Sequence, residues 1–411
     1  MRGPRCSADL IPARRGPSRI DPEMSFQLRV PGPTPVPPRV QDAMAVPMIN
    51  HRGPAFAELI TECREGLQWA FQTRNEMVMF PCSGTGGLEA AVVNLTSPGE
   101  KAVFVSIGSF GDRFAKIGAA YGADVVKLDY EWGRGAQADD VARTLDENPE
   151  ARVLFITHNE TSTATCNDIA PIARVAKERG RLVALDGVSS VSSIDLPTDE
   201  LGIDVVISGS QKGWMLPPGL AFLSVSAAAL EFSRSARCPR FYFDINRELE
   251  FELKGQTFTT PPVSILFGLR ESLRMMRAEG LQEVFARHAR IAGGVRKAVQ
   301  SLELELFADP RYYSNTVTAV KAPGGDADLN KKLIATLRDN HKLELAGGQG
   351  KLAGQIFRIG HLGDISEDDG RQIIGRLEQA LVEIGYIDGP VGAVDSYVEA
   401  LGHQPATAPP A

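Results

Sequence analysis

Short apolar runs alternate with amphipathic stretches through the first half of the chain. The runs have strand length and lack alternating polar positions, so each strand is expected to be buried on both faces. This pattern predicts an α/β fold, with a mainly parallel seven-stranded sheet flanked by helices. The candidate strands are 77–80, 102–106, 125–128, 153–157, 182–186, 205–208 and 221–225. The candidate helices are 54–73, 87–95, 110–121, 138–145, 169–179 and 227–234.

The pattern changes after about residue 262, where long amphipathic helices dominate, so a smaller α+β domain is expected there. Its candidate helices cover 262–302, 329–337 and 367–384, and its candidate strands cover 316–320 and 355–359. A proline-rich segment precedes the first helix, and proline favours extended backbone. The predicted division is a disordered tail at 1–24, an extended arm at 25–50, a large domain at 51–262, a small domain at 263–390 and a C-terminal tail at 391–411.

Composition narrows the class of protein. The chain has 411 residues, 43% of them hydrophobic and 23% charged, which is ordinary for a globular protein. A net charge of −7 argues against general nucleic-acid binding. No apolar run approaches the roughly 18 residues that a membrane span requires, so no membrane association is expected. The five cysteines form no CxxC pair and no metal-type cluster with the six histidines. We therefore expect no metal site and a reducing, cytoplasmic location.

One lysine has a distinctive setting. The segment 208–212 reads Ser-Gly-Ser-Gln-Lys and follows a candidate strand, while Asp186 ends the preceding candidate strand. A lysine among small residues at a strand end, with a buried acid upstream, suits a pyridoxal phosphate enzyme. Lys212 would form the Schiff base, and Asp186 would pair with the ring nitrogen. A solvated lysine and a helix-capping aspartate are the alternative for either residue alone.

Further motifs lie at other predicted strand ends. The segment 83–87 reads Ser-Gly-Thr-Gly-Gly and opens a helix, whose free N–H groups could bind a phosphate or could simply be capped. Phe110 could stack on a planar cofactor or belong to the core. The hydroxyl cluster at 157–165 could donate to a cofactor oxygen or form a turn. His158 within it is more typical of a structural residue.

Arg358 interrupts an apolar strand. A buried guanidinium is costly unless it is paired. A bound carboxylate would pair it through a bidentate fork, whereas a structural salt bridge would satisfy it equally well.

Taken in order, these motifs identify a resemblance. Its most specific parts are the Ser-Gly-Ser-Gln-Lys segment followed by Pro-Pro-Gly at 217–219, and Pro-Gly-Pro-Thr at 31–34. His-Asn-Glu-Thr-Ser-Thr at 158–163 and Leu-Arg-Glu-Ser-Leu at 269–273 add to it. The chain resembles the class V pyridoxal phosphate aminotransferases of fold type I from Arg29 to about Ile384. Within that family it is most similar to the alanine–glyoxylate and serine–glyoxylate aminotransferases.

The resemblance implies pyridoxal 5'-phosphate as cofactor and Lys212 as the catalytic lysine. Gly32 and Arg358 fall at substrate-binding positions, with Arg358 on the α-carboxylate. Thr260 is expected to reach the phosphate of a neighbouring subunit, which implies a homodimer with shared active sites. The positions implied for the cofactor are Ser83, Gly84, Thr85, Phe110, Thr161, Asp186, Gln211, Lys212, Thr257 and Thr260.

Three positions depart from the animal alanine–glyoxylate enzymes. Phe110 stands where they carry tryptophan, Thr85 where they carry histidine, and Thr257 where they carry a phosphate-binding tyrosine. The stacking face and the backbone donors remain, so the cofactor site is expected to work. The changes leave the exact substrate open.

The implied reaction is a ping-pong transfer of an amino group from alanine or serine to a 2-oxo acid, with glyoxylate as the expected acceptor. Small substrates are favoured because no second arginine is evidently placed for a dicarboxylate, although Arg52 could serve. Aspartate and ureidoglycine–glyoxylate aminotransferases share the motifs and stay open. A cysteine desulfurase-like lyase is disfavoured because no cysteine follows Cys238 and Phe110 replaces the stacking histidine. A non-catalytic partner subunit is disfavoured by the intact Lys212, Asp186 and Arg358.

Overall fold

The computed structural model describes residues 26–402, and its largest element is a seven-stranded sheet. The strand order is β2-β10-β9-β8-β5-β3-β4. All neighbouring pairs are parallel except the two that involve β10. The predicted, mainly parallel sheet is therefore confirmed. Its strands are β2 (Glu76–Phe80), β3 (Lys101–Ser106), β4 (Asp124–Asp129), β5 (Val153–Thr157), β8 (Leu182–Asp186), β9 (Val205–Gly209) and β10 (Ala221–Val225).

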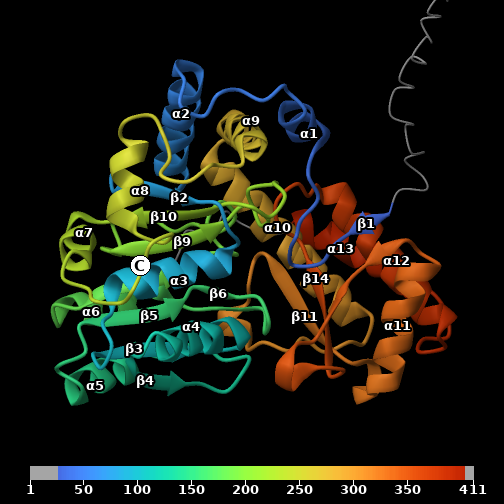
Figure 1. Cartoon of the computed structure of the whole chain (residues 1–411). Helices are drawn as coiled ribbons and strands as arrows, with labels where there is room; N and C mark the ends of the chain where they lie inside the picture. The colour runs from blue at the N-terminus through green and yellow to red at the C-terminus, as the bar shows by residue number, and fades with distance from the viewer. Residues whose placement is uncertain (1–25, 403–411) are drawn as a thin grey trace, which may run out of the picture.

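Helices cover both faces of this sheet, and each face has its own apolar core (Figure 1). One core includes side chains from α2, α5, α6 and α9, and the other includes side chains from α3, α4, α7 and α8. The apolar side chains on the two faces of the sheet are thus buried beneath helices. The helices are α2 (Pro54–Ala70), α3 (Gly84–Leu95), α4 (Ser109–Ala120), α5 (Ala138–Glu147), α6 (Ile169–Glu178), α7 (Ala227–Ser233), α8 (Ile245–Glu252) and α9 (Val263–Glu279).

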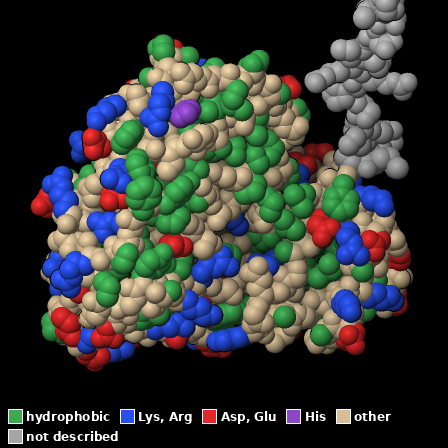
Figure 2. All heavy atoms as spheres, in the orientation of Figure 1, with side chains coloured by type: hydrophobic (Ala, Val, Ile, Leu, Met, Phe, Trp, Pro, Cys, Tyr) green, Lys and Arg blue, Asp and Glu red, His purple; other side chains and the backbone are tan. Residues whose placement is uncertain are grey.

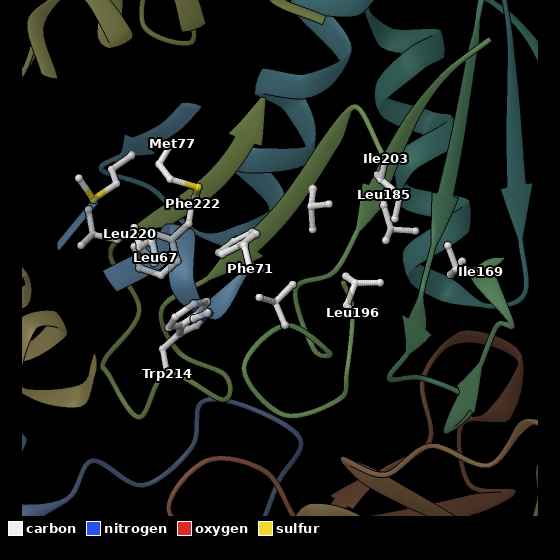
Figure 3. Packing of buried hydrophobic residues seen from close by; sticks show 14 of the residues in the cluster. Leu67, Phe71, Met77, Ile169, Leu185, Leu196, Ile203, Trp214, Leu220 and Phe222 are labelled. Carbon is white, nitrogen blue, oxygen red and sulfur yellow. The ribbon is translucent and has the colours of Figure 1, made fainter. Parts of the chain in front are cut away.

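Trp214 anchors the loop that follows β9. Its indole is fully buried and stacks on Phe71, with 5.7 Å between ring centroids, and it meets Phe222 edge-on at 5.2 Å (Figure 3). The indole Nε1 donates a hydrogen bond to Ser208 Oγ over 2.8 Å. Because Trp214 lies two residues after Lys212, this packing fixes the loop that carries the lysine.

Residues from Ile291 onward build a separate apolar core around α10 and a three-stranded sheet in the order β11-β14-β13, whereas α9 packs in the core of the large sheet. Helix α13 packs against α10 and buries Tyr397 fully. The tail expected from residue 391 is therefore wrong for this helix, because its apolar side chains cover the core. The elements are α10 (Leu281–Ser301), β11 (Val317–Lys321), α11 (Ala327–Asp339), β12 (Leu343–Glu344), β13 (Ala346–Gly347), β14 (Ile356–Gly360), α12 (Glu367–Glu383) and α13 (Ala393–Gly402).

The proline-rich arm joins the two parts of the chain. Strand β1 (Gln27–Leu28) pairs in parallel with β12, and the backbone N–H of Gly360 donates to Arg29 O over 2.7 Å. Farther along, the N–H of Thr34 donates to Gln211 O. The expectation of a wholly extended arm is wrong for α1 (Pro38–Met44), because proline fits the first turn of a helix.

The other predicted helices and strands are confirmed with small differences at their ends. The sequence reading missed α8, whose buried face contains Glu248 and Glu252 beside Ile245 and Leu249. Within residues 26–402, every helix is too short or too polar to cross a membrane. The tail predicted at 1–24 and the final residues 403–411 lie outside the described part of the chain.

Candidate active site

A cavity of about 250 Å³ opens at the carboxyl ends of the parallel strands. Ligands of open α/β sheets commonly bind at this edge, where the loops after several strands meet. Eight of the residues assigned from the sequence lie here together. The cavity is lined by Gly32, Pro33, Ser83, Gly84, Thr85, Leu88, Phe110, Arg113, Asp186, Val188, Gln211, Lys212 and Pro218.

Lys212 reaches this cavity from the loop after β9 and is only 8% exposed. Burial lowers the pKa of its amine to about 8, and the charge of Asp186 opposes that fall. Its Nζ donates to Pro31 O of the arm over 2.5 Å. A Cβ on Gly32 would lie 2.7 Å from Nζ, so only glycine leaves room for the amine. Gly32 also has a φ of +132°, which side chains rarely adopt.

Asp186 is the last residue of β8 and is 4% exposed. Burial raises the pKa of its carboxyl group to about 7, and a hydrogen bond from the N–H of Val188 opposes that rise. A cation held against this carboxylate would replace the water that burial removes. The position therefore suits an ion pair with a protonated ring nitrogen.

Ser83, Gly84 and Thr85 form the N-terminal turn of α3. Ser83 is the N-cap, but its side chain does not cap the helix. The free N–H groups and the positive end of the helix dipole therefore remain available to an anion. The buried side-chain oxygen of Gln211 has no hydrogen-bond partner among the described residues, which is typical of a group that a ligand completes.

Phe110 lies in the first turn of α4 and lines the same cavity. The fully buried carboxylate of Glu160 accepts hydrogen bonds from the N–H groups of Phe110 and Gly111, over 2.9 and 3.1 Å. Its other oxygen accepts from the N–H and hydroxyl of Ser162. Glu160 thus fixes the residue expected to stack on the ring. The sequence reading missed this role because Glu160 resembles an ordinary polar loop residue.

Thr161 belongs to a buried hydroxyl and amide network behind the cavity. Its Oγ1 donates to Ser189 Oγ over 3.0 Å, and that oxygen also accepts from Asn159 Nδ2. His158 is buried and its pKa is lowered to about 4 by burial, so the ring is neutral near pH 7. The structural interpretation of His158 therefore fits its environment.

Arg358 is 4% exposed and does not line the cavity, but it lies close enough to Lys212 for its charge to help lower the pKa of that amine. Among residues 26–402, its hydrogen bonds go to backbone carbonyls and to no carboxylate. Its Nε and Nη2 donate to Gly347 O over 2.9 and 2.7 Å, and its Nη1 donates to Thr161 O over 3.1 Å. A guanidinium has five N–H donors. These bonds use three, and the two that remain lie one on each η nitrogen. Arg358 therefore forms no structural salt bridge among the described residues. Its two remaining donors could still bind the two oxygens of a carboxylate.

Neither Thr257 nor Thr260 lines this cavity. The hydroxyl of Thr257 donates to Thr259 O, and Thr260 is exposed. Their assignment to a neighbouring subunit stays a prediction. The structure instead adds Arg113, which lines the cavity and which the sequence reading did not single out.

These groups match three of the four polar parts of pyridoxal phosphate. The uncharged donors at the start of α3 suit its phosphate, Asp186 suits its ring nitrogen, and the Lys212 amine suits its aldehyde. Phe110 can cover the ring between them. A cradle with free N–H donors at the start of α3 and no room for a Cβ at Gly32 therefore fits this cofactor.

Comparison with known proteins finds relatives that span most of the chain. A soluble hydrogenase 42 kDa subunit of Anabaena cylindrica is 40% identical over 371 residues, covering 90% of this chain and 96% of that protein. An L-aspartate–glyoxylate aminotransferase of Paracoccus denitrificans is 39% identical over 363 residues, covering 87% and 91%. A serine–glyoxylate aminotransferase of Hyphomicrobium methylovorum is 40% identical over 348 residues, covering 83% and 85%.

The fold comparison leads to the same group. The structure of an alanine–glyoxylate aminotransferase from Nostoc sp. superimposes with a TM-score of 0.83 at 29% identity, covering 90% of this chain and 97% of that one. Residues 30–350 match the family described as aminotransferase class-V. The resemblance found in the sequence is thus confirmed, and the chain belongs to the class-V aminotransferases, with the fold type I architecture of their pyridoxal phosphate enzymes.

Proposed function

We propose that this chain uses pyridoxal 5'-phosphate to move an amino group from alanine or serine to glyoxylate. The observation that carries the proposal is the meeting of Lys212, Asp186 and the open N-terminus of α3 at one cavity. Relatives about 40% identical are named for glyoxylate as a substrate, which supports glyoxylate as the acceptor.

In this proposal, the chain's own residues bind the cofactor and move one proton. When bound, pyridoxal phosphate supplies an electron sink that stabilises the charge left by loss of the substrate's α-proton. Lys212 binds the aldehyde, and its freed amine accepts the α-proton and later returns it. A pKa near 8 suits this role, because the neutral and charged amines are then both accessible near neutral pH. Asp186 holds the proton on the ring nitrogen.

Arg358 and Phe110 orient the reacting groups. The two unused N–H donors of Arg358 can form a fork on the α-carboxylate of the amino acid. Phe110, held by Glu160, would cover one face of the ring and keep water from it. Holding the reacting groups in place lowers the activation barrier, because less entropy is lost in reaching the reactive geometry.

Small donors are favoured over dicarboxylic ones because the arginines near the cavity have other partners in this proposal. Arg358 serves the α-carboxylate, and Arg113 donates to Thr85 Oγ1. Arg52, the alternative anchor for a second carboxylate, donates to Gln256 Oε1 over 2.9 Å. We expect alanine or serine to bleach the visible absorbance of the bound cofactor faster than aspartate does. We also expect glyoxylate to exceed 2-oxoglutarate in kcat/KM, and the reverse order would refute the substrate assignment.

Attachment of the cofactor to Lys212 has a direct test. Borohydride reduction of the loaded protein should fix the cofactor to the peptide that contains Lys212. The Lys212→Ala variant should lose both the adduct and turnover, whereas Lys331→Ala on the exposed face of α11 should keep them. An adduct on another lysine would contradict the assignment. A protein that takes up no cofactor at all would favour the non-catalytic subunit instead.

We further propose a homodimer in which Thr257 and Thr260 complete the partner's phosphate site. The ring of Phe241 is 68% exposed and lies 5.3 Å from that of Phe258, in the same loop as both threonines. Figure 2 shows a broad hydrophobic area in the upper half of one face of the molecule. A second copy would cover apolar surface of this kind. Sedimentation of a fully active monomer would contradict the shared site.

Two coarser proposals accompany the activity. The four cysteines in the described residues, Cys63, Cys82, Cys166 and Cys238, are free thiols, which supports a reducing, cytoplasmic location. The separate apolar core from Ile291 to Tyr397 supports a small C-terminal domain that includes α13, while the packing of α9 in the core of the large sheet favours a start of that domain later than residue 262.

A further inference from the structure

Arg113 occupies a position between two parts of the proposed cofactor site. It lies on α4, one turn after Phe110, and lines the cavity. Its Nη1 donates a hydrogen bond to Thr85 Oγ1 over 2.9 Å. Its guanidinium carbon lies 4.8 Å from the centre of the Phe110 ring, which is a cation–π distance. One exposed side chain therefore connects the turn at the start of α3 with the aromatic ring on α4.

The charges that line the cavity leave Arg113 without another assigned role. Three lining residues are charged, namely Arg113, Asp186 and Lys212. Lys212 and Asp186 serve the aldehyde and the ring nitrogen in the proposed function. The groups assigned to the phosphate dianion are all uncharged, so Arg113 is the remaining cation of the lining. Buried or half-buried anions are stabilised strongly by a nearby charge of opposite sign.

The bond to Thr85 also sets the direction of a hydroxyl group. A threonine hydroxyl has one donor hydrogen and two acceptor lone pairs. Because Arg113 donates to Thr85 Oγ1, that oxygen serves as the acceptor on this side, and its own hydrogen is free to point elsewhere. Thr85 lies in the first turn of α3, where an anion would sit. The guanidinium thus prepares the hydroxyl to donate to a phosphate oxygen.

We propose that Arg113 is a positioning residue for the cofactor phosphate, which it acts on through the hydroxyl of Thr85 and through its positive charge. The stacking of its guanidinium on Phe110 keeps it in this place. The inference rests on the proposed use of pyridoxal phosphate.

The test compares a ligand that has the phosphate with one that lacks it. The titrations use the cofactor-free protein with Lys212 intact. In the Arg113→Gln variant, we expect the dissociation constant of pyridoxal phosphate to rise about tenfold or more, because a charge-assisted hydrogen bond is lost. Binding of pyridoxal, which has no phosphate, should stay within about twofold of the wild type, because the N–H of Phe110 is bonded to the Glu160 carboxylate independently of Arg113 and the main loss falls on the phosphate. Arg113→Lys keeps the charge and should recover part of the affinity. Both constants can be followed by quenching of protein fluorescence.

Two comparisons separate this role from a general effect of charge or folding. Lys116→Gln removes the same charge from the same exposed face of α4 and should leave both constants unchanged. Thr85→Val should weaken the phosphate ligand, and combining it with Arg113→Gln should cost less than the two separate losses together, because the residues share one bond.

Several outcomes would overturn the inference. They are unchanged binding of pyridoxal phosphate in Arg113→Gln, equal weakening of pyridoxal and pyridoxal phosphate, or an equal effect of Lys116→Gln. A wild-type protein that binds neither ligand would instead refute the proposed function. The two failures are therefore distinguishable in the same titrations.

Discussion

Replacing Arg358 with lysine should remove the carboxylate fork while keeping a positive charge. In the structure, three of the five N–H donors hold the guanidinium against Gly347 O and Thr161 O, and one donor on each η nitrogen remains. A lysine ammonium cannot present two parallel donors from a fixed plane. Loss of one to two charged hydrogen bonds, at roughly 1.5–3 kcal/mol each, would total about 1.5–6 kcal/mol. Because lysine keeps the charge and can still donate to one oxygen, we expect about 2–4 kcal/mol of that range. That corresponds to a fall of about 30- to 1,000-fold in kcat/KM.

Steady-state kinetics with alanine or serine and glyoxylate would measure this loss, and most of it should appear in KM. Arg296→Lys is the matched control because Arg296 is a half-buried arginine of the C-terminal region. It donates to Ser314 O over 2.9 Å and lies over the Tyr313 ring, away from the cavity lining. We expect Arg296→Lys to change stability but not KM. An unchanged KM in Arg358→Lys, or an equal rise in the control, would refute the assigned carboxylate site.

Three further changes test separate parts of the reasoning. Asp186→Asn should lower kcat by about a thousandfold or more, since an amide cannot hold the ring proton by charge, and an unchanged rate at full cofactor loading would reduce Asp186 to a helix cap. The rate of cofactor attachment to apoprotein should fall about tenfold for each pH unit below 8, because the Lys212 amine is then protonated; a flat profile would contradict the lowered pKa. Ser208→Ala should leave the Trp214 indole N–H unpaired and lower the free energy of unfolding by about 1–3 kcal/mol in urea titrations, whereas the exposed Ser235→Ala should have little effect.

The sequence predicts the sheet and the chemistry at its edge because both depend on local patterns. Lys212, Asp186 and the turn at Ser83 each follow an apolar run of strand length, and parallel strands deliver their carboxyl ends to one edge. No contact between distant segments has to be known for that prediction.

The residues that the sequence reading missed depend on such contacts. Glu160 acts on Phe110, fifty positions away along the chain, and its carboxylate has no local signature. Arg113 resembles a solvated helix charge until α4 is placed beside α3, where it meets Thr85. Helix α13 has an apolar face, but the proline-rich residues that follow it favour assignment of the whole segment 391–411 to a tail.

The arm described above also constrains when the protein can become functional during its synthesis. Gln27 is among the first described residues to leave the ribosome, yet its β-partner is Leu343, and Gly360 must be made before it can donate to Arg29 O. Domains synthesised first generally fold first, but contacts between such distant residues must wait. Pro31, which accepts the hydrogen bond of Lys212, lies in this same arm. A ribosome-bound chain that lacks its last 70 or so residues could thus form the sheet but not the finished lysine site.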